Sequence, residues 1–66
     1  MTIQLNGESY DIPEPVSVDA LLLRLDIDAR RVAVEVNEIV VKKAAYGDTV
    51  VGAGDAVEVV NFVGGG

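Results

Sequence analysis

The chain has 66 residues, of which five are Lys or Arg, eleven are Asp or Glu, and none is His, Cys or Trp, so its formal net charge is −6. This length suits one small domain. Half of the residues are apolar and thirteen are Val, which favours a folded, strand-rich chain. The charge argues against binding to nucleic acid or to an anionic membrane, because both require clustered cations. The Arg30-Arg31 and Lys42-Lys43 pairs are expected to be solvated loop ends.

The sequence also limits the location of the protein and the chemistry of its side chains. No apolar run approaches the roughly 20 residues of a membrane span, and no signal peptide is recognised at the N-terminus. The absence of Cys excludes a disulfide, a thiolate nucleophile and a Cys-ligated metal, and it fits a reducing compartment. We expect a cytoplasmic protein without a metal site.

A β-hairpin is predicted over residues 1–12. Ile3 and Leu5 alternate with polar residues, which is the pattern of a half-buried strand. Asn6-Gly7 is a strong hairpin signal because both residues tolerate a positive φ. The returning strand ends before Pro13, because proline cannot donate to a strand ladder.

One helix is predicted to follow, ending near Asp26. Ser17 is a suitable N-cap, and Asp19 lies where the helix dipole favours an acidic residue. Leu23 lies off the apolar stripe and is expected to be exposed. The stripe itself has helical spacing and consists of Val18, Leu21, Leu22 and Leu25.

The rest of the chain is interpreted as short strands separated by turns. Strands are predicted at 32–36, 39–41, 49–51 and 57–63, with one turn of helix at 42–46. Gly52-Ala53-Gly54-Asp55 is interpreted as a tight turn, because a phosphate-binding loop needs a third glycine and a following helix, and Asp55 would repel phosphate.

The order of these elements predicts an α+β fold with one main helix packed on one face of a mixed sheet. It is the order of ubiquitin-like β-grasp domains, in which the first and last strands lie side by side and parallel at the centre of the sheet.

We predict no catalytic side chains. The chain lacks His and Cys, and neither Ser9 nor Ser17 has a candidate base beside it. The carboxylates are interpreted as solvated surface charges. We therefore do not expect this domain to be an enzyme by itself.

The last predicted strand supplies candidates for partner binding. Alternation assigns Val57 and Val59 to the core, so that Glu58, Val60 and Phe62 face outward. Two interpretations of the outward residues remain open: a docking surface, or ordinary exposed apolar residues. The candidate partner-binding residues are Glu58, Val60, Phe62 and Val63.

The chain ends in Gly64-Gly65-Gly66, which we predict to be a flexible tail on a domain of residues 1–63. A frayed end or a cloning remnant is the alternative, but the glycines continue directly from the strand. Three extended glycines reach roughly 10 Å, and without Cβ atoms they fit a narrow channel. The Gly66 carboxylate is thus an accessible group for another enzyme to activate.

Together these features resemble the ubiquitin-like sulfur carriers, and most closely the ThiS family of thiamine biosynthesis. The resemblance covers the whole chain and rests on residues 3–7 (IQLNG), 32–37 (VAVEVN) and 54–66 (GDAVEVVNFVGGG), of which the last block is the most specific. Ala44-Ala45 and Ala53 make the segment before the last turn plainer than the family pattern.

The resemblance implies a role as a protein substrate. A partner adenylyltransferase would use ATP and Mg²⁺ to adenylate the Gly66 carboxylate, and a persulfide donor such as a cysteine desulfurase relay would supply sulfur that displaces AMP. The resulting thiocarboxylate would pass its sulfur to thiazole synthase. The carrier itself would bind no cofactor and would be a monomer on its own.

Three other functions remain open. The small subunit of molybdopterin synthase uses the same terminal thiocarboxylate, although such proteins tend to be longer. A protein modifier would form isopeptide bonds through Gly66, and a plain interaction domain would make no use of its tail.

Overall fold

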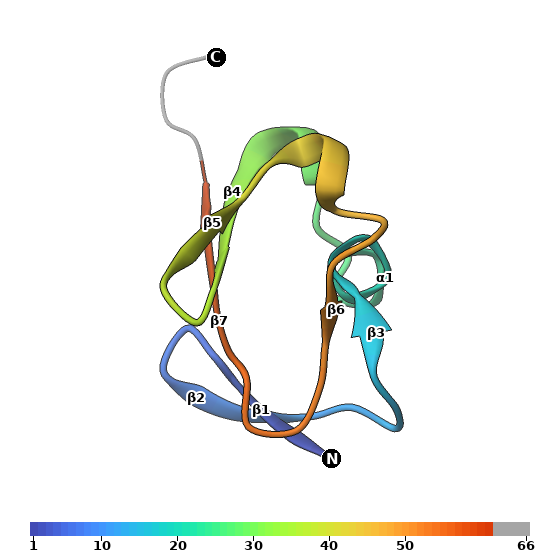
Figure 1. Ribbon diagram of the computed structural model, residues 1–66, viewed down its shortest axis with the longest axis vertical. Coiled ribbons are helices and arrows are strands. Elements are labelled where there is room, and N and C mark those ends of the chain that lie inside the picture. Colours follow the sequence, from blue (N-terminus) through green and yellow to red (C-terminus); the bar gives the residue numbers. More distant parts are fainter. Residues whose placement is uncertain (62–66) are drawn as a thin grey trace.

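Seven strands, one α-helix and two 3₁₀-helices make up residues 1–61, which are the part of the chain that the computed structural model describes (Figure 1). The strands are β1 (Thr2–Leu5), β2 (Glu8–Asp11), β3 (Val16–Ser17), β4 (Val32–Val36), β5 (Ile39–Val41), β6 (Val50–Val51) and β7 (Ala56–Asn61). The helices are α1 (Val18–Arg24), η1 (Ala29–Arg31) and η2 (Lys43–Ala45). None of these helices is long and apolar enough to cross a membrane.

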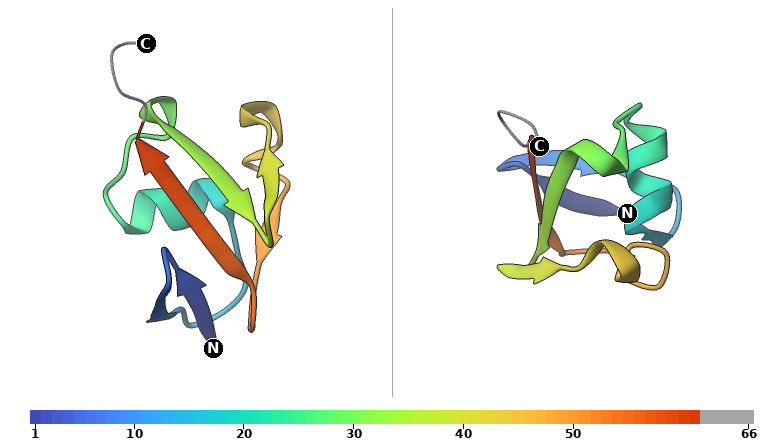
Figure 2. Two further views of the ribbon diagram at one scale, coloured as in Figure 1. Left: turned by 90° about the vertical axis from the view of Figure 1, so that its left-hand side faces the viewer. Right: turned by 90° about the horizontal axis from the view of Figure 1, so that it is seen from above.

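Five strands form one mixed sheet in the order β2-β1-β7-β4-β5, which makes β7 the central strand. β1 runs parallel to β7, with Gln4 opposite Ala56 and Leu5 opposite Val57, and the other pairs are antiparallel. Figure 2 shows α1 covering one face of this sheet. The predicted α+β class and the parallel pairing of the first and last strands at the sheet centre are therefore confirmed.

Two features of the strands differ from the prediction. β3 pairs with β6 in a separate two-stranded sheet, with Val16 opposite Val51. β3 was not predicted, because two residues are too short to show a period. The last strand, predicted over 57–63, begins one residue earlier at Ala56 and is described to Asn61; Phe62 and Val63 lie outside the described residues.

Helix α1 begins as predicted, and it ends close to Asp26, also as predicted. The Ser17 hydroxyl accepts a hydrogen bond from the Ala20 N–H at 3.1 Å, which confirms the N-cap. At the other end Asp26 has a φ of +60°, so the helix cannot continue through it. The Ile27 N–H then bonds back to the Leu22 carbonyl at 2.9 Å, closing the Schellman arrangement of helix ends.

The core lies between α1 and the inner face of the sheet. Leu21 and Leu22 are buried as the apolar stripe predicted, whereas Leu23 is 81% exposed. The Tyr46 hydroxyl, buried with them, donates to the Val32 carbonyl at 3.2 Å, so its polar atom is satisfied. The buried residues are Ile3, Ile12, Val18, Leu21, Leu22, Val32, Val34, Tyr46, Val51 and Val57.

The turn before β7 is closed by hydrogen bonds to Asp55. Gly54 has a φ of +83°, which a turn of this shape requires. The Asp55 carboxylate accepts hydrogen bonds from the Gly52 N–H at 2.8 Å and from the Asn37 side-chain amide at 3.0 Å. The prediction of a tight turn is confirmed, and these bonds lower the pKa of the Asp55 carboxyl.

This lowered pKa predicts a dependence of stability on pH. The bonds from Asn37 and Gly52 hold the pKa of folded Asp55 below its ordinary value of 3.8, so its contribution to the free energy of unfolding is complete above that value and is lost as the pH falls through the folded pKa. Urea unfolding of the wild type and Asp55→Asn should therefore show a stability difference that shrinks as the pH falls below about 4. A difference that stayed constant into strong acid would contradict this role of Asp55.

Candidate functional site

Strand β7 carries the two candidate binding residues that the structure describes. Val57 is buried and Val59 half-buried, whereas Glu58 is exposed and Val60 is 59% exposed. The predicted alternation is therefore confirmed as far as Val60. The remaining candidates, Phe62, Val63 and the three glycines that end at Gly66, lie outside the described residues.

The register of the sheet shows which neighbours share a face with Glu58 and Val60. Ala33 lies opposite Val60 on β4, and Glu35 lies between Glu58 on β7 and Val40 on β5. We call these five residues the outer face, since they lie opposite the face that packs on α1. Val40 is 66% exposed. Ala33, Glu35 and Val40 were not predicted, because only strand pairing reveals that they adjoin β7.

One side of β7 is held by Asn6. β1 ends at Leu5, but the Asn6 side chain continues its pairing: its Oδ1 accepts from the Val59 N–H at 2.7 Å, and its Nδ2 donates to the Val59 carbonyl at 3.3 Å. The Asn6 backbone N–H also donates to the Val57 carbonyl at 2.9 Å. This amide thus replaces the next peptide group of a strand beside β7.

Asn37, in the turn between β4 and β5, holds the beginning of β7 in the same way. Its backbone N–H donates to the Ala56 carbonyl at 2.7 Å, and its Oδ1 accepts from the Ala56 N–H at 2.9 Å. Asn6 and Asn37 have φ values of +50° and +52°; Asn6 was predicted in the hairpin turn, and Asn37 lies between the strands predicted at 32–36 and 39–41. Their contacts with β7 were missed, because the pairing spans 53 positions for Asn6 and 19 for Asn37.

The Asn6 contact predicts a measurable loss of stability. Asn6→Gly keeps a residue that tolerates the positive φ but leaves the Val59 N–H and carbonyl without the side-chain amide, so we expect the free energy of unfolding to fall by about 1–2 kcal/mol. Asn6→Asp keeps the acceptor for the Val59 N–H and should lose less. Urea unfolding of both variants measures this order, and an Asn6→Gly variant as stable as the wild type would contradict it.

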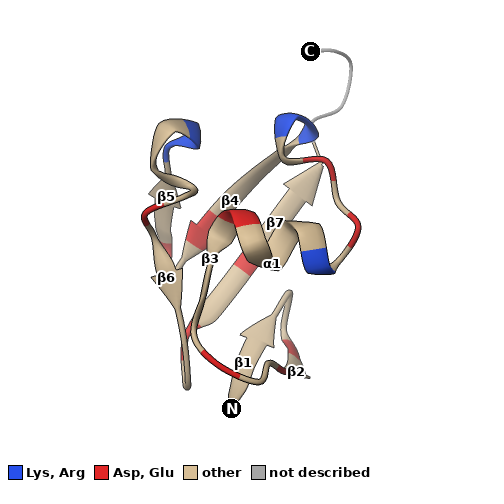
Figure 3. Ribbon diagram, turned by 90° about the vertical axis from the view of Figure 1, so that its right-hand side faces the viewer, with Lys and Arg blue, Asp and Glu red and all other residues tan. Residues whose placement is uncertain are grey.

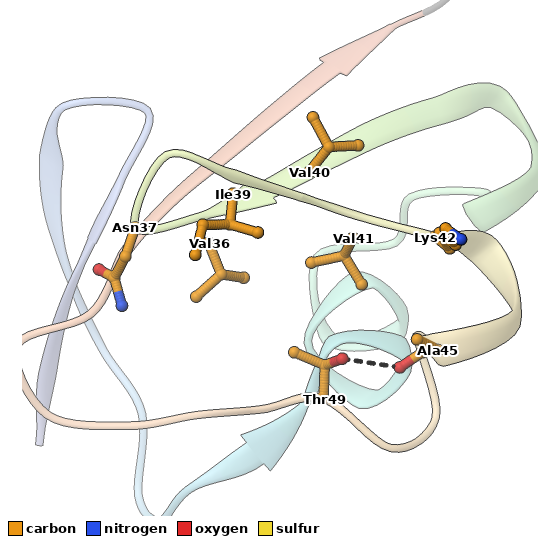
Figure 4. Close-up of a pocket in the computed structure, with 8 residues that line it drawn as sticks. All are labelled: Val36, Asn37, Ile39, Val40, Val41, Lys42, Ala45 and Thr49. Carbon is orange, nitrogen blue, oxygen red and sulfur yellow. Dashed lines mark hydrogen bonds between the residues drawn. The ribbon is translucent and has the colours of Figure 1, made fainter.

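A groove of about 450 Å³ lies beside β5, between this strand and the segment from η2 to β6 (Figure 4). Its lining is mainly apolar, with Val36, Ile39 and Val41 among its residues. The Thr49 hydroxyl donates to the Ala45 carbonyl at 2.9 Å, so this polar group is already engaged. No group of three or more His, Cys, Asp or Glu residues within 1–61 could hold a metal ion. Among the described residues, the features available to a binding partner are therefore strand β7, the outer face and this groove.

Comparison with protein families identifies the family to which the chain belongs. Residues 3–66 match the family described as ThiS. The chain belongs to the ThiS family. Members of the ThiS family are thiamine-biosynthesis sulfur carriers, small proteins that are not themselves enzymes and bind no cofactor. The match extends to the last residue, Gly66.

Solved structures of the ThiS family agree with this fold. A crystal structure of the thiamine biosynthesis protein (ThiS) from Geobacter metallireducens has a TM-score of 0.89 and 38% identity, and the match covers all of both chains. An NMR solution structure of a thiamine biosynthesis protein from the same organism has a TM-score of 0.81 and 39% identity over all of this chain and 88% of that one.

Two relatives of this ThiS family member differ in length. A thiazole synthase from Paramagnetospirillum magneticum is 42% identical over 66 residues, which are the whole chain but only 20% of that relative. An uncharacterized protein, ycf40, from Pyropia yezoensis is 39% identical over the same length and is covered to 93%. The chain therefore spans about a fifth of the thiazole synthase relative and nearly all of the other.

Proposed function

We propose that this chain carries sulfur on the carboxylate of Gly66. A partner adenylyltransferase binds ATP and Mg²⁺, and the Gly66 carboxylate oxygen attacks the α-phosphorus, releasing pyrophosphate and leaving an acyl adenylate. The terminal sulfur of a persulfide donor then attacks the acyl carbon and expels AMP. A thiol breaks the remaining S–S bond, and the Gly66 thiocarboxylate becomes the sulfur source for thiazole synthase.

The observation that carries this proposal is the family match that runs through Gly66. The chemistry also suits a glycine end, because a carboxylate without a side chain nearby can enter a narrow site on another protein. Activation to the adenylate replaces a poor leaving group with AMP. In this proposal residues 1–63 are the domain that partners bind, and residues 64–66 are the tail.

The fold fixes the position from which the chain continues toward Gly66. β7 is the central strand, and it is paired on both sides as well as held by Asn6 and Asn37. The point from which the chain continues toward Gly66 is therefore fixed relative to the rest of the domain. A partner that binds the domain in one orientation receives the tail in one direction, which is how proximity and orientation contribute to the rate.

The outer face is the surface we propose for docking on these partners. Glu35 and Glu58 lie directly opposite each other, and like charges so placed weaken a sheet. The exposed Val40 lies opposite Glu35 on β5, and the exposed Val60 lies two residues beyond Glu58 on β7. Folding alone does not favour this arrangement, whereas a partner that covers the two valines and supplies cations for the two carboxylates would make use of it.

Thiazole synthase is proposed as one such partner. The relatives that bear this name match the chain over about a fifth of their own length, so in them a region like this chain is joined covalently to further sequence. A covalent connection keeps two cooperating parts at high effective concentration. We propose that this chain meets thiazole synthase in the same way.

Intact-mass measurement tests the proposed function. The protein is incubated with ATP, Mg²⁺, sulfide and the adenylyltransferase of the same genome. We expect the mass gain of one oxygen-to-sulfur exchange, located at Gly66 by fragmentation. A ladder of larger adducts would indicate a protein modifier instead, and an unchanged mass would contradict both. Rescue of a thiazole auxotroph, compared with rescue of a molybdopterin-deficient strain, separates the thiamine pathway from the molybdopterin alternative.

A further inference from the structure

The positive charges of this acidic protein gather at one end. Four of the five Lys and Arg residues lie in or next to the two 3₁₀-helices: Arg30 and Arg31 in η1, Lys43 in η2 and Lys42 directly before it. We call these four residues the basic end. Figure 3 shows both helices at the end of the molecule toward which β7 runs. The sequence suggested two separate solvated pairs, and the fold brings them together.

Hydrogen bonds connect the two halves of the basic end. The Lys43 ammonium donates to the Ala29 carbonyl at 2.8 Å and to the Val32 carbonyl at 3.2 Å, which ties η2 to η1 and to the start of β4. Tyr46, just after η2, donates its hydroxyl to the same Val32 carbonyl. The relative position of η1 and η2 is thus set within the free protein, so a ligand does not have to order them.

The two arginines of the basic end stay exposed although they adjoin a carboxylate. Asp28 accepts two hydrogen bonds from the Arg30 guanidinium, at 2.9 and 3.1 Å, and its carboxylate lies 3.7 Å from Arg31. The Arg30 hydrogen bonds lower the pKa of Asp28 to about 2, so this carboxylate is charged at neutral pH. The Arg30 and Arg31 side chains are 87% and 82% exposed.

The η1 part of the basic end lies beside the last described residue of β7. Val32, the residue after η1, is paired with Asn61, the last described residue of β7. The opposed carboxylates Glu35 and Glu58 lie three pairs further back, at about 10 Å along the strands. The chain therefore continues toward Gly66 from the positive end of the molecule, and the acidic part of the outer face lies behind it.

The length of the tail decides which anion this surface can meet. Five residues separate Asn61 from Gly66, and an extended chain spans at most about 17 Å over that length. When the Gly66 carboxylate is at the α-phosphate of ATP, side chains of η1 and η2 remain near the entrance of the channel that holds the tail. Protein carboxylates at the entrance are within their reach, whereas phosphates at its far end are not.

We propose that the basic end docks on acidic side chains at the rim of the tail channel in the activating adenylyltransferase. This inference rests on the proposed function, because it takes Gly66 to be the group activated. Attraction at this end, which adjoins the start of the tail, turns the approaching carrier tail-first. Such steering raises the association rate and weakens as salt screens the charges.

Two variants with the same net charge test this surface. Arg31→Gln/Lys42→Gln removes two cations from the basic end, and Arg24→Glu, on α1, changes the net charge equally; both take it from −6 to −8. Adenylation of the wild type and both variants is followed as pyrophosphate release at about 0.01 M ionic strength, where charges act over about 30 Å, and again near 1 M, where they act over about 3 Å. Urea unfolding confirms that both variants are folded.

At low salt we expect kcat/KM of Arg31→Gln/Lys42→Gln to fall about tenfold, whereas kcat/KM of Arg24→Glu should stay near the wild-type value. The kcat at saturating carrier should be unchanged in both variants. At high salt the kcat/KM values of all three proteins should converge. Equal kcat/KM for the two variants, whether both are lowered or both unchanged, would overturn the basic end as the docking surface while leaving activation of Gly66 intact. A wild type that is not adenylated at all would overturn the proposed function and this inference with it.

Discussion

Deletion of Gly65 and Gly66 should abolish adenylation and sulfur transfer without changing the free energy of unfolding. The shortened chain still ends in a glycine carboxylate, on Gly64, so the reacting group is chemically the same. Its carboxylate lies about 7 Å short of the original position, at roughly 3.4 Å per extended residue. Since a misplacement of about 1 Å costs about a hundredfold in rate, we expect a loss of at least that size.

A variant of unchanged length separates the effect of tail length from the effect of the residue at its end. Gly66→Ala keeps the carboxylate at the original distance and adds one methyl group, so it should retain more activity than the deletion. Pyrophosphate release and intact mass report the activity of each variant, and urea unfolding reports stability. If the deleted protein acquired sulfur as fast as the wild type, activation could not depend on the position of the Gly66 carboxylate.

The elements of this fold could be predicted where the information is local. Alternation of apolar residues located β1, β4 and the core face of β7, because period 2 follows from strand geometry alone. Ser17 and the stripe through Leu21 and Leu22 located the start and the buried face of α1. The end of α1 near Asp26 was also predicted, but not its positive φ, because the chain has no glycine at this position to mark it.

Features that depend on distant residues could not be predicted. β3 exists only because Val16 meets Val51, and neither segment is long enough to show a pattern by itself. Asn6 was interpreted as a hairpin residue, which is correct but incomplete, since its amide bonds to Val59. The same holds for the candidate site: Glu58 and Val60 follow from alternation on one strand, whereas their neighbours and the basic end depend on how the strands and 3₁₀-helices assemble.

Replacement of Val60 by Asp should weaken binding to the adenylyltransferase far more than it weakens the fold. Val60 is exposed on the outer face beside the end of β7, so a partner that receives the tail covers it. Burying a carboxylate there without a matching cation would cost about 2 kcal/mol or more, or about thirtyfold in affinity. Isothermal titration with the partner in the absence of ATP measures this change.

Val50→Asp is the matched control for this prediction. Val50 is 61% exposed, against 59% for Val60, and it also lies in a strand, but in β6, which belongs to the separate two-stranded sheet. Both substitutions place Asp in a strand, so both should lower the free energy of unfolding by about 1 kcal/mol. Only Val60→Asp should lose affinity if the outer face docks on the partner. Equal affinity of the two variants would show that the partner leaves Val60 in solvent, and a Val60→Asp variant that failed to fold would mean that this side chain supports the core.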